Sequence, residues 1–594
     1  MDTPKLPSDC IEEILKSLDK DNDRTSLYSW TLVNRSWCKI AISLLWGHPF
    51  TDMKFDGDDH ETGRLLIRTY ISCLSDDKRQ ILIDEGHNLK VTKTLFDYPS
   101  YLKELHIGHV QASIGHWWEK STDYMLKQKA QFQTVVSLIL EMLFNKCNGL
   151  KKLDCELQQF YYRSADFISF AGTQKAISRL NELRIDCSSV DQGHLFELLT
   201  MIIKDSQYIN HIVITPLHDS PLAQQIPRLI ESQHNLTSFK MNSTLVGSFD
   251  PSRSASIFSS LTSQLNSLTI LDFRKIYIDG NSLDILIKCL NLKSLKFVNC
   301  YQEQDITVSE SSCKTSSHLK INRLTLNSEI SRKTFLSSKT CTTIIMMSKN
   351  HLKELAIDFS TPELLQFIHT QLSNLTSLAI RTIPPLHQLE WISNSNTLSH
   401  LALSDVDVNS CLFSITICQQ IGRLLPINLK HLQLESRFNI APESLTGLLE
   451  RSVARLEILS LDVEKFDDTL LEVVGDYARD TGKHLKELRI CKDTRIEFDH
   501  NLCKKLLNDI PSINLNYEDP WPILIEEIFI LKKQNLNKWK KDTYLLNQSM
   551  GPFLIEFWIF HTNTPVPDMS ENASTEDRLR ALIIVVNGQG RFIT

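Results

Sequence analysis

A short unit with the pattern apolar-x-x-apolar-x-apolar recurs along most of the chain. It reads LKELHI at Leu102, LNELRI at Leu180 and LKHLQL at Leu429. The other eleven units begin at Leu150, Ile209, Leu236, Leu268, Leu292, Ile321, Leu352, Leu375, Leu398, Leu456 and Leu485. Such a pattern often occurs by chance in a chain that is 42% hydrophobic, so its weight depends on its spacing.

The spacing is close to regular. From Leu150 to Leu485 the units are 23 to 32 residues apart, with a mean near 28. The segments between them, such as PELLQFIHTQLSNL and ESLTGLLERSVARL, have helical periodicity with a polar face. Strand and helix alternating at a fixed period predict a parallel sheet on the inside of an arc and helices outside. The first, fourth and sixth residues of each unit should face the core, and the third, fifth and seventh the concave surface.

In these units the chain resembles leucine-rich repeats of the longer, helix-containing kind. The resemblance covers roughly two thirds of the sequence and implies an α/β solenoid of about 14 units over residues 102–515. The Asn or Cys typical of the ninth position is mostly missing. Cys300 fits, whereas Ser360 and Ile383 stand at other ninth positions, so irregular turns are expected. An α-solenoid is the alternative, but Ile, Phe and Val at the strand positions favour strands.

The first 46 residues have a different organisation. Ser8 can cap a helix whose apolar stripe is Ile11, Ile14, Leu15 and Leu18. Two more short helices are expected, with apolar residues Leu27, Trp30 and Val33 in one and Trp37, Ala41, Leu44 and Leu45 in the other. Three helices in about forty residues bury too little surface to be stable alone. They should therefore dock on the rest of the chain or present apolar surface to a partner.

This segment resembles an F-box, the motif that binds the adaptor subunit of SCF-type (cullin–RING) ubiquitin ligases. The residues that carry the resemblance are Leu6-Pro7, Ile14-Leu15, Leu18, Val33-Asn34-Arg35, Trp37 and Leu45-Trp46. It implies an adaptor interface formed by Leu6, Pro7, Ile14, Leu15, Leu18, Val33 and Trp37, and, through the adaptor, association with cullin and RING subunits. A helical N-terminal cap without a partner is the alternative.

Two further segments flank the repeats. Residues 47–101 contain an amphipathic pattern from Leu65 to Leu74 and are expected to form a helical connector that caps the first repeat. Residues 516–594 contain the apolar runs PWPILIEEIFIL, FLIEFWIF and LIIVV. These runs predict a folded C-terminal cap and argue against a disordered tail.

Charge and composition exclude several classes of protein. The 64 Lys and Arg against 71 Asp and Glu give a net charge of −7, which disfavours nucleic acid as a partner. The longest apolar run, Ala581 to Val586, is far shorter than a membrane span of about 20 residues. The N-terminus does not read as a secretory signal, and the 14 Cys form no C-x-x-C. An intracellular protein with reduced thiols, cytoplasmic or nuclear, is expected.

Motifs for catalysis or cofactor binding are missing from the sequence. There is no G-x-x-x-x-G-K-[ST], H-E-x-x-H, G-x-S-x-G or G-x-G-x-x-G. His106, His109 and His116 lie close together beside Trp117-Trp118, but no carboxylate or thiolate stands at ligand spacing from them. A structured surface insertion in residues 108–149 is expected instead. We therefore predict a non-catalytic protein with no cofactor and no metal.

The resemblances together suggest the substrate-recognition subunit of an SCF-type ubiquitin ligase, whose repeats hold a target protein. Four basic residues fall on inward positions of successive middle units: Lys240, Arg274, Lys296 and Arg323, with Asp272 the one acid among them. Such a strip suits an acidic or phosphorylated target segment. A repeat scaffold for protein–protein interaction outside any ligase is the alternative function.

Overall fold

The computed structural model describes most of the first 517 residues. The chain divides into two compact units, Met1–Tyr517 and Glu518–Thr594. All described residues belong to the first unit, so the predicted C-terminal cap lies outside them, apart from its first two residues. The described residues are 10–15, 24–50, 60–89, 93–118, 126–155, 169–186, 192–215, 221–243, 250–302, 305–306, 319–327, 336–358, 361–381, 385–405, 413–436, 440–463, 465–479, 485–491, 495–497, 510 and 512–517.

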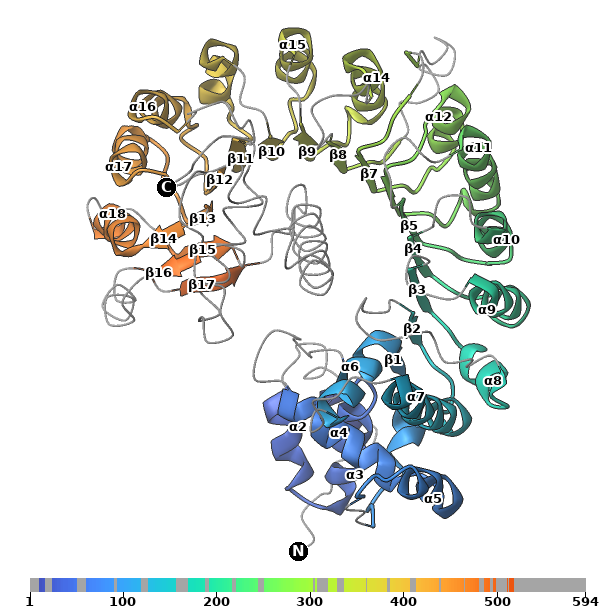
Figure 1. Ribbon diagram of the computed structural model, residues 1–594. Helices are drawn as coiled ribbons and strands as arrows, with labels where there is room; N and C mark the ends of the chain where they lie inside the picture. Colours follow the sequence, from blue (N-terminus) through green and yellow to red (C-terminus); the bar gives the residue numbers. More distant parts are fainter. Residues whose placement is uncertain are drawn as a thin grey trace, which may run out of the picture. The chain divides into compact units, whose positions relative to one another are not determined.

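Fifteen parallel strands form one continuous sheet, and each strand pairs with its neighbours in chain order (Figure 1). All fourteen predicted units contribute one strand each, and the fifteenth follows at Ser512. The prediction of parallel strands is confirmed against the α-solenoid. The strands are β1 (Glu104–His106), β2 (Lys152–Asp154), β3 (Glu182–Asp186), β4 (His211–Thr215), β5 (Ser238–Asn242), β6 (Ile270–Arg274), β7 (Ser294–Val298), β8 (Arg323–Asn327), β9 (Glu354–Ile357), β10 (Ser377–Ile380), β11 (His400–Asp405), β12 (His431–Ser436), β13 (Ile458–Asp462), β15 (Glu487–Cys491) and β17 (Ser512–Tyr517).

The register of this sheet places the fourth residue of every unit side by side. The row begins at Leu105, which pairs with Leu153, and ends at Leu488, which pairs with Ile513. Every member from Leu105 to Leu488 is buried. A slip of one residue in any strand would turn its apolar side chains to the other face, so this row fixes the register.

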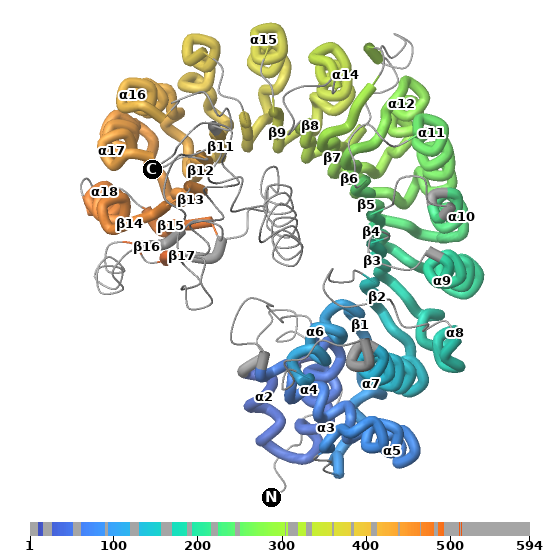
Figure 2. Tube along the Cα trace, in the orientation of Figure 1, coloured from blue at the N-terminus to red at the C-terminus, as the bar shows by residue number. Residues whose placement is uncertain are grey.

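Helices cover the core side of the sheet (Figure 2). The opposite face of the sheet is called the inner face below; it carries the third, fifth and seventh residues of the units. β14 (Lys465–Asp467) and β16 (Arg495–Glu497) form a separate two-stranded sheet. The helices are α8 (Thr173–Ile177), α9 (Gln192–Asp205), η3 (Pro221–Gln224), α10 (Gln225–Glu231), α11 (Pro251–Ser260), η4 (Leu261–Gln264), α12 (Gly280–Ile287), α14 (Ser338–Ser348), α15 (Pro362–Gln371), η6 (Leu386–Asn394), α16 (Ile415–Leu424), α17 (Pro442–Arg451) and α18 (Asp468–Arg479).

The N-terminal part of this unit is helical. Residues 10–15 form a helix, followed by α2 (Arg24–Thr31) and α3 (Arg35–Leu45). The connector contains α4 (His60–Ser72), α5 (Asp76–Asp84) and the short η1 (Tyr98–Tyr101). The predicted amphipathic helix is α4, whose Ile67, Tyr70 and Ile71 are buried.

Residues 108–149 do not form the expected surface insertion. They fold into α6 (Ile107–Trp118) and α7 (Leu126–Lys146), and both helices contribute to the main core. α6 lies against α4 of the connector. That expectation was wrong because Val110 and Ile114 of α6, and Val135, Ile139 and Leu143 of α7, form apolar stripes at helical spacing, and all five side chains are buried.

Substitutions at core-facing strand positions should destabilise the protein more than substitutions at inner-face positions. Leu401 and Leu432 are buried and lie side by side in register on β11 and β12. Replacing either with Ala should lower the free energy of unfolding by roughly 2–5 kcal/mol, since a cavity is left in the core. Ala402→Ser and Gln433→Ser, on the inner face, should cost far less. Urea unfolding followed by circular dichroism measures both, and equal losses would contradict the assigned faces.

A close approach of α16 and α17 depends on glycine. A Cβ built on Gly422 would lie 2.3 Å from the carbonyl oxygen of Leu448, a backbone atom that cannot move alone. The matched position, Gly447, would bring its Cβ to 2.9 Å from Cγ of the flexible Gln419 side chain. Gly422→Ala should therefore lower the melting temperature. Gly447→Ala should be neutral or stabilising, because Ala favours helix by about 1 kcal/mol over Gly. The reverse order would contradict this packing.

Candidate protein interaction surfaces

The N-terminal helices have a small core of their own. Ile11 and Leu15 of the first helix, Leu27 of α2, and Ala41 and Leu44 of α3 form a buried cluster separate from the main core. α3 begins at an N-cap, Asn34, whose side chain accepts hydrogen bonds from the backbone N–H groups of Ser36 and Trp37 at 2.9 and 3.0 Å. Asn34 therefore fixes the start of α3 at the centre of the motif Val33-Asn34-Arg35.

Aromatic stacking joins α2 to α3. The rings of Trp30 and Trp37 are parallel within 13°, with centroids 4.2 Å apart, and both pack on the small core. The separate core and this stacked pair let the helices hold their own arrangement while leaving part of their apolar surface outside it.

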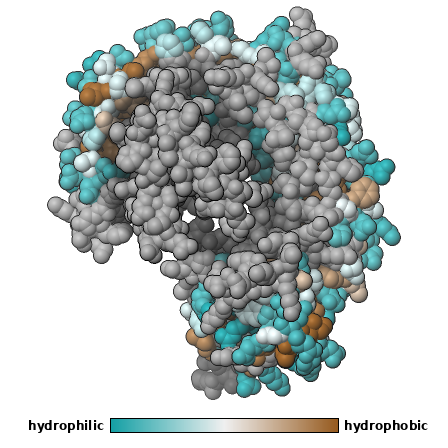
Figure 3. All heavy atoms as spheres, viewed as in Figure 1, coloured by the Kyte–Doolittle hydropathy of each residue, from teal (hydrophilic) through white to brown (hydrophobic). Residues whose placement is uncertain are grey.

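Large apolar side chains remain exposed on these helices. Their exposed fractions are 43% for Ile14, 62% for Tyr28, 74% for Leu32 and 58% for Val33. In the space-filling view, apolar residues are visible among polar ones in the lower part of the molecule, where the N-terminal helices and the connector lie (Figure 3). Four large apolar side chains are therefore exposed within one short segment.

The predicted adaptor-binding residues fall into three groups. Ile14 and Val33 are exposed, as a contact residue must be. Trp37 is half-buried in its stack, and Leu15 is fully buried, so Leu15 could act on a partner only through the fold of the helices. Leu6, Pro7 and Leu18 lie outside the described residues.

The segment after α3 is fastened to the connector and the first repeat. The Trp46 ring lies with its centroid 4.1 Å from that of Tyr98 and 5.5 Å from that of Tyr70. The carbonyl oxygen of Gly47 accepts hydrogen bonds from the backbone N–H groups of Lys103 and Glu104, at 2.8 and 2.9 Å. The N-terminal helices are thus joined to the edge of the sheet by backbone hydrogen bonds and aromatic contacts.

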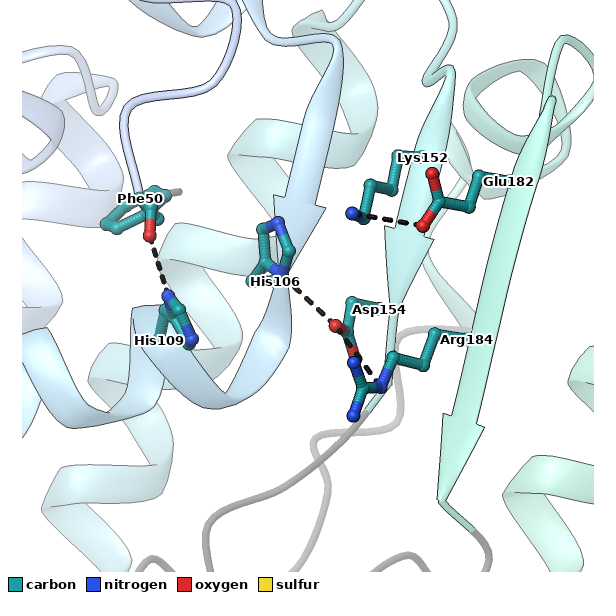
Figure 4. A network of polar contacts seen from close by, with 7 residues as sticks. All are labelled: Phe50, His106, His109, Lys152, Asp154, Glu182 and Arg184. Atoms are coloured by element: carbon teal, nitrogen blue, oxygen red, sulfur yellow. Dashed lines mark hydrogen bonds and ion pairs between the residues drawn. The ribbon is translucent and has the colours of Figure 1, made fainter. Parts of the chain in front are cut away.

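A polar network follows this junction onto β1, β2 and β3 (Figure 4). His109 of α6 is hydrogen-bonded through Nδ1 to the carbonyl oxygen of Phe50, at 2.6 Å, and its ring stacks on His106. Nδ1 of His106 lies 3.2 Å from Oδ2 of Asp154, which Arg184 approaches at 3.9 Å.

A second ion pair in the network, Lys152 with Glu182, spans 3.0 Å between β2 and β3. Neighbouring strands therefore present opposite charges to one another on the inner face, which stabilises their pairing. Sequence reasoning considered His106 and His109 only as metal ligands. The fifth position of successive units, held by His106 and Asp154, was the signal for their pairing.

The four predicted target-binding residues lie on neighbouring strands of the inner face. Asp272 of β6 stands in register between Lys240 of β5 and Lys296 of β7. Nε of Arg274 lies 3.3 Å from Oδ1 of Asp272, and Arg323 is hydrogen-bonded to Glu354 of the next strand. The four basic residues therefore lie on consecutive strands, with Asp272 beside three of them and Glu354 beside the fourth, and the side chain of Arg274 is buried.

Two histidines stack further along the same face. The rings of His400 on β11 and His431 on β12 are parallel within 9°, with centroids 4.1 Å apart, and Nε2 of His431 lies 2.7 Å from Oγ of Ser460. Burial is the main reason that the pKa of His400 falls to about 4 and that of His431 to about 3. The neighbouring His400 also lowers the pKa of His431, and the positive charge of Arg489 lowers the pKa of both rings. Both imidazoles are neutral at pH 7.

Two observations bear on metal binding and thiol chemistry in the described part of the chain. Within those ranges, no group of three or more His, Cys, Asp and Glu could hold a metal ion. Burial raises the pKa of the Cys289, Cys300 and Cys418 thiols to about 12, so they are protonated at neutral pH and poor nucleophiles. No helix among the described residues is both long and apolar enough to cross a membrane.

Of three comparisons with known proteins, only the one with solved structures finds similar proteins. No protein-family model matches the chain, and no curated protein matches it. The leucine-rich-repeat-containing protein LegL7 of Legionella pneumophila is similar with 13% identity and a TM-score of 0.31, over 51% of this chain and 91% of that one. A leucine-rich-repeat protein of Leptospira interrogans shows 13% identity and a TM-score of 0.25, over 70% of this chain and 96% of that one. TM-scores this low carry no argument about the fold. The assignment of the fold therefore rests on the fifteen-stranded sheet of the chain itself.

The half-buried, stacked histidine pair should make the protein sensitive to acid. Unfolded histidines titrate near pH 6.5, so between about pH 6.5 and pH 4 the unfolded chain binds more protons than the folded one. As the pH is lowered through this window, the free energy of unfolding should therefore decrease, by at most about 1.4 kcal/mol per pH unit for each ring. His400→Phe/His431→Phe keeps two stacked rings but cannot titrate, so its urea midpoint should fall less steeply. Parallel pH curves for the two proteins would contradict the assignment.

Proposed function

We propose that this protein is the substrate-recognition subunit of an SCF-type ubiquitin ligase. The N-terminal helices would bind the adaptor and, through it, the cullin and RING subunits, while the repeats would bind a target protein. The observation that supports this proposal is the separate small core within residues 10–45, with Ile14, Leu32 and Val33 exposed beside it. Helices that hold their own arrangement and still expose apolar side chains are suited to a permanent protein partner.

The contacts at the junction between the two parts agree with this role. A receptor of this kind contributes proximity: it keeps target lysines near a ubiquitin-carrying enzyme that other subunits hold. The hydrogen bonds to Gly47 and the contacts of Trp46 limit the motion of the helices on the first repeat, so a target bound on the sheet would stay at a defined distance from the adaptor.

Target binding is assigned to the inner face of the repeats. Lys240, Arg274, Lys296 and Arg323 are proposed as contacts for an acidic or phosphorylated part of the target, because guanidinium and ammonium groups bind carboxylates and phosphates strongly. Arg274 and Arg323 would exchange their present carboxylate partners, Asp272 and Glu354, for those of the target. A repeat scaffold outside any ligase would use the same face without the adaptor.

Binding to the purified adaptor subunit distinguishes the two functions. Ile14→Glu/Val33→Glu places two charges on exposed positions, so it should weaken adaptor binding at least about tenfold without changing the melting temperature. Leu95→Glu/Val453→Glu is the matched control, since these side chains are exposed elsewhere, and it should bind like the unmodified protein. Isothermal titration calorimetry measures the affinity.

The outcome against the proposal is equally clear. If the unmodified protein binds no adaptor, the scaffold function is the correct one. If it binds the adaptor but Ile14→Glu/Val33→Glu binds equally well, the assignment of the adaptor interface to these helices is wrong. Leu15→Ala is less informative, because its side chain is fully buried and the substitution would disturb the helices themselves.

A further inference from the structure

The turns that lead into the strands lie together along one edge of the sheet. All strands of the sheet run in the same direction, so each connection from a helix to the next strand arrives at the same end. We call these turns the leading edge; each consists of the residues between the end of a helix and the second residue of the next unit. Backbone hydrogen bonds hold neighbouring turns in register. The carbonyl oxygen of Lys293, for example, accepts from the N–H groups of Asn322 and Arg323 at 2.9 and 3.1 Å.

The leading edge is basic, although the chain as a whole is acidic. Acids outnumber Lys and Arg by 71 to 64 in the sequence, but the described residues of the leading edge contain eleven Lys or Arg and one acid, Glu457. The basic residues are Lys103, Lys151, Arg179, Lys288, Lys293, Lys320, Lys349, Lys353, Lys430, Arg455 and Lys486. The carboxylate of Glu457 is neutralised by two of them, since Lys430 approaches it at 3.1 Å and Lys486 at 2.8 Å.

The positive charge is densest in the turns before β7, β8 and β9. These turns contain Lys288, Lys293, Lys320, Lys349 and Lys353, and no acid among their described residues. Lys349 is half-buried and the other four are exposed, and none of the five forms an ion pair with a described residue. Lys293 and Lys353 stand two strands apart, which is about 10 Å. Such a concentration of unneutralised cations attracts a partner that carries many negative charges.

Large apolar side chains are exposed between these cations. The exposed fractions are 69% for Tyr208, 51% for Leu290, 66% for Ile427 and 63% for Val453, and all four lie in turns of the leading edge. The turns that contain them precede β4, β7, β12 and β13. From β4 to β13 the sheet extends over about 43 Å, at about 4.8 Å per strand. The apolar side chains are therefore spread along the edge, with basic residues between them.

Helix dipoles account for part of this pattern only. The helices end at the leading edge, and cations are favoured at helix C-termini, but the effect is confined to the last turn of the helix. Lys293 and Lys353 stand six and five residues beyond the ends of α12 and α14, next to the starts of the strands. A helix dipole also gives no reason for Ile427 and Val453 to be exposed. Cations interleaved with exposed apolar side chains are instead typical of surfaces that bind at the membrane interface.

A lipid surface fits this edge better than a nucleic acid or an acidic protein does. Nucleic-acid bases stack on aromatic side chains, whereas Leu290, Ile427 and Val453 are aliphatic. A protein interface has its apolar residues gathered in a buried centre with a polar rim, whereas these side chains are separated. A bilayer surface offers anionic headgroups and an apolar boundary everywhere along the edge, so dispersed apolar residues can all reach it.

We propose that the leading edge binds the surface of a membrane that contains anionic lipids. The Lys and Arg side chains contact the headgroups, and Tyr208, Leu290, Ile427 and Val453 enter the boundary between headgroups and acyl chains. Binding of this kind requires no membrane-spanning segment. The inference is independent of the proposed function, because the leading edge contains none of the residues assigned to adaptor or target binding.

Vesicle sedimentation with the full-length protein tests the proposal. The protein should bind phosphatidylcholine vesicles that contain about 30% phosphatidylserine at least about tenfold more tightly than vesicles of phosphatidylcholine alone, and added salt should weaken this binding. Lys293→Glu/Lys320→Glu/Lys353→Glu reverses three exposed charges at the densest part of the edge. It should reduce the affinity for the anionic vesicles at least about tenfold.

The matched control is Arg68→Glu/Lys93→Glu/Lys339→Glu. It changes the net charge of the protein by the same amount at exposed positions outside the leading edge, so it should bind the anionic vesicles like the unmodified protein. Equal binding by the two triple variants, or no binding of the unmodified protein to anionic vesicles, would overturn the proposal. All variants should keep their affinity for the adaptor, so a failure here is distinguishable from a failure of the proposed function.

A second pair of variants separates a lipid surface from other anionic partners. Ile427→Ser/Val453→Ser should reduce the affinity for anionic vesicles about fivefold or more, because these side chains no longer enter the apolar boundary. Leu65→Ser/Leu95→Ser, at exposed positions of the connector, is the control and should have no effect. If Ile427→Ser/Val453→Ser also has none, or if single-stranded DNA or polyglutamate binds more tightly than the vesicles, the proposed membrane contact is wrong.

Discussion

The protein depends on the in-register burial of one apolar residue from every strand. A single repeat has only its neighbours to pack on and cannot bury its apolar face alone. The row from Leu105 to Leu488 solves this by stacking each fourth-position side chain against the next. The arrangement of the inner face follows from that row, because the register that buries it also decides which inner-face residues stand side by side.

The inner face consequently varies in charge along the sheet. Its beginning, on β1 to β3, pairs opposite charges across strands, as in Lys152 with Glu182. Its middle, on β5 to β8, is basic, and its later part, on β9 to β15, contains further ion pairs, such as Arg381 with Asp358 and Arg489 with Glu487.

The N-terminal helices illustrate how a very small core can serve a larger protein. Five buried residues hold them together, and the contacts of Trp46 and Gly47 add the support that so few residues cannot supply. The same smallness leaves the side chains of Ile14, Leu32 and Val33 exposed. An exposed apolar surface is thus a direct result of building three helices from so few residues.

The sequence by itself determined the fourteen strands, the faces of their side chains and the helices between them, because both periodicities are local. Only the tertiary structure showed that α6 and α7 join the core, that His106 meets Asp154 48 residues away, and that the rings of His400 and His431 stack. Such relations depend on register and on which helix packs on which, and they arise only when distant segments meet.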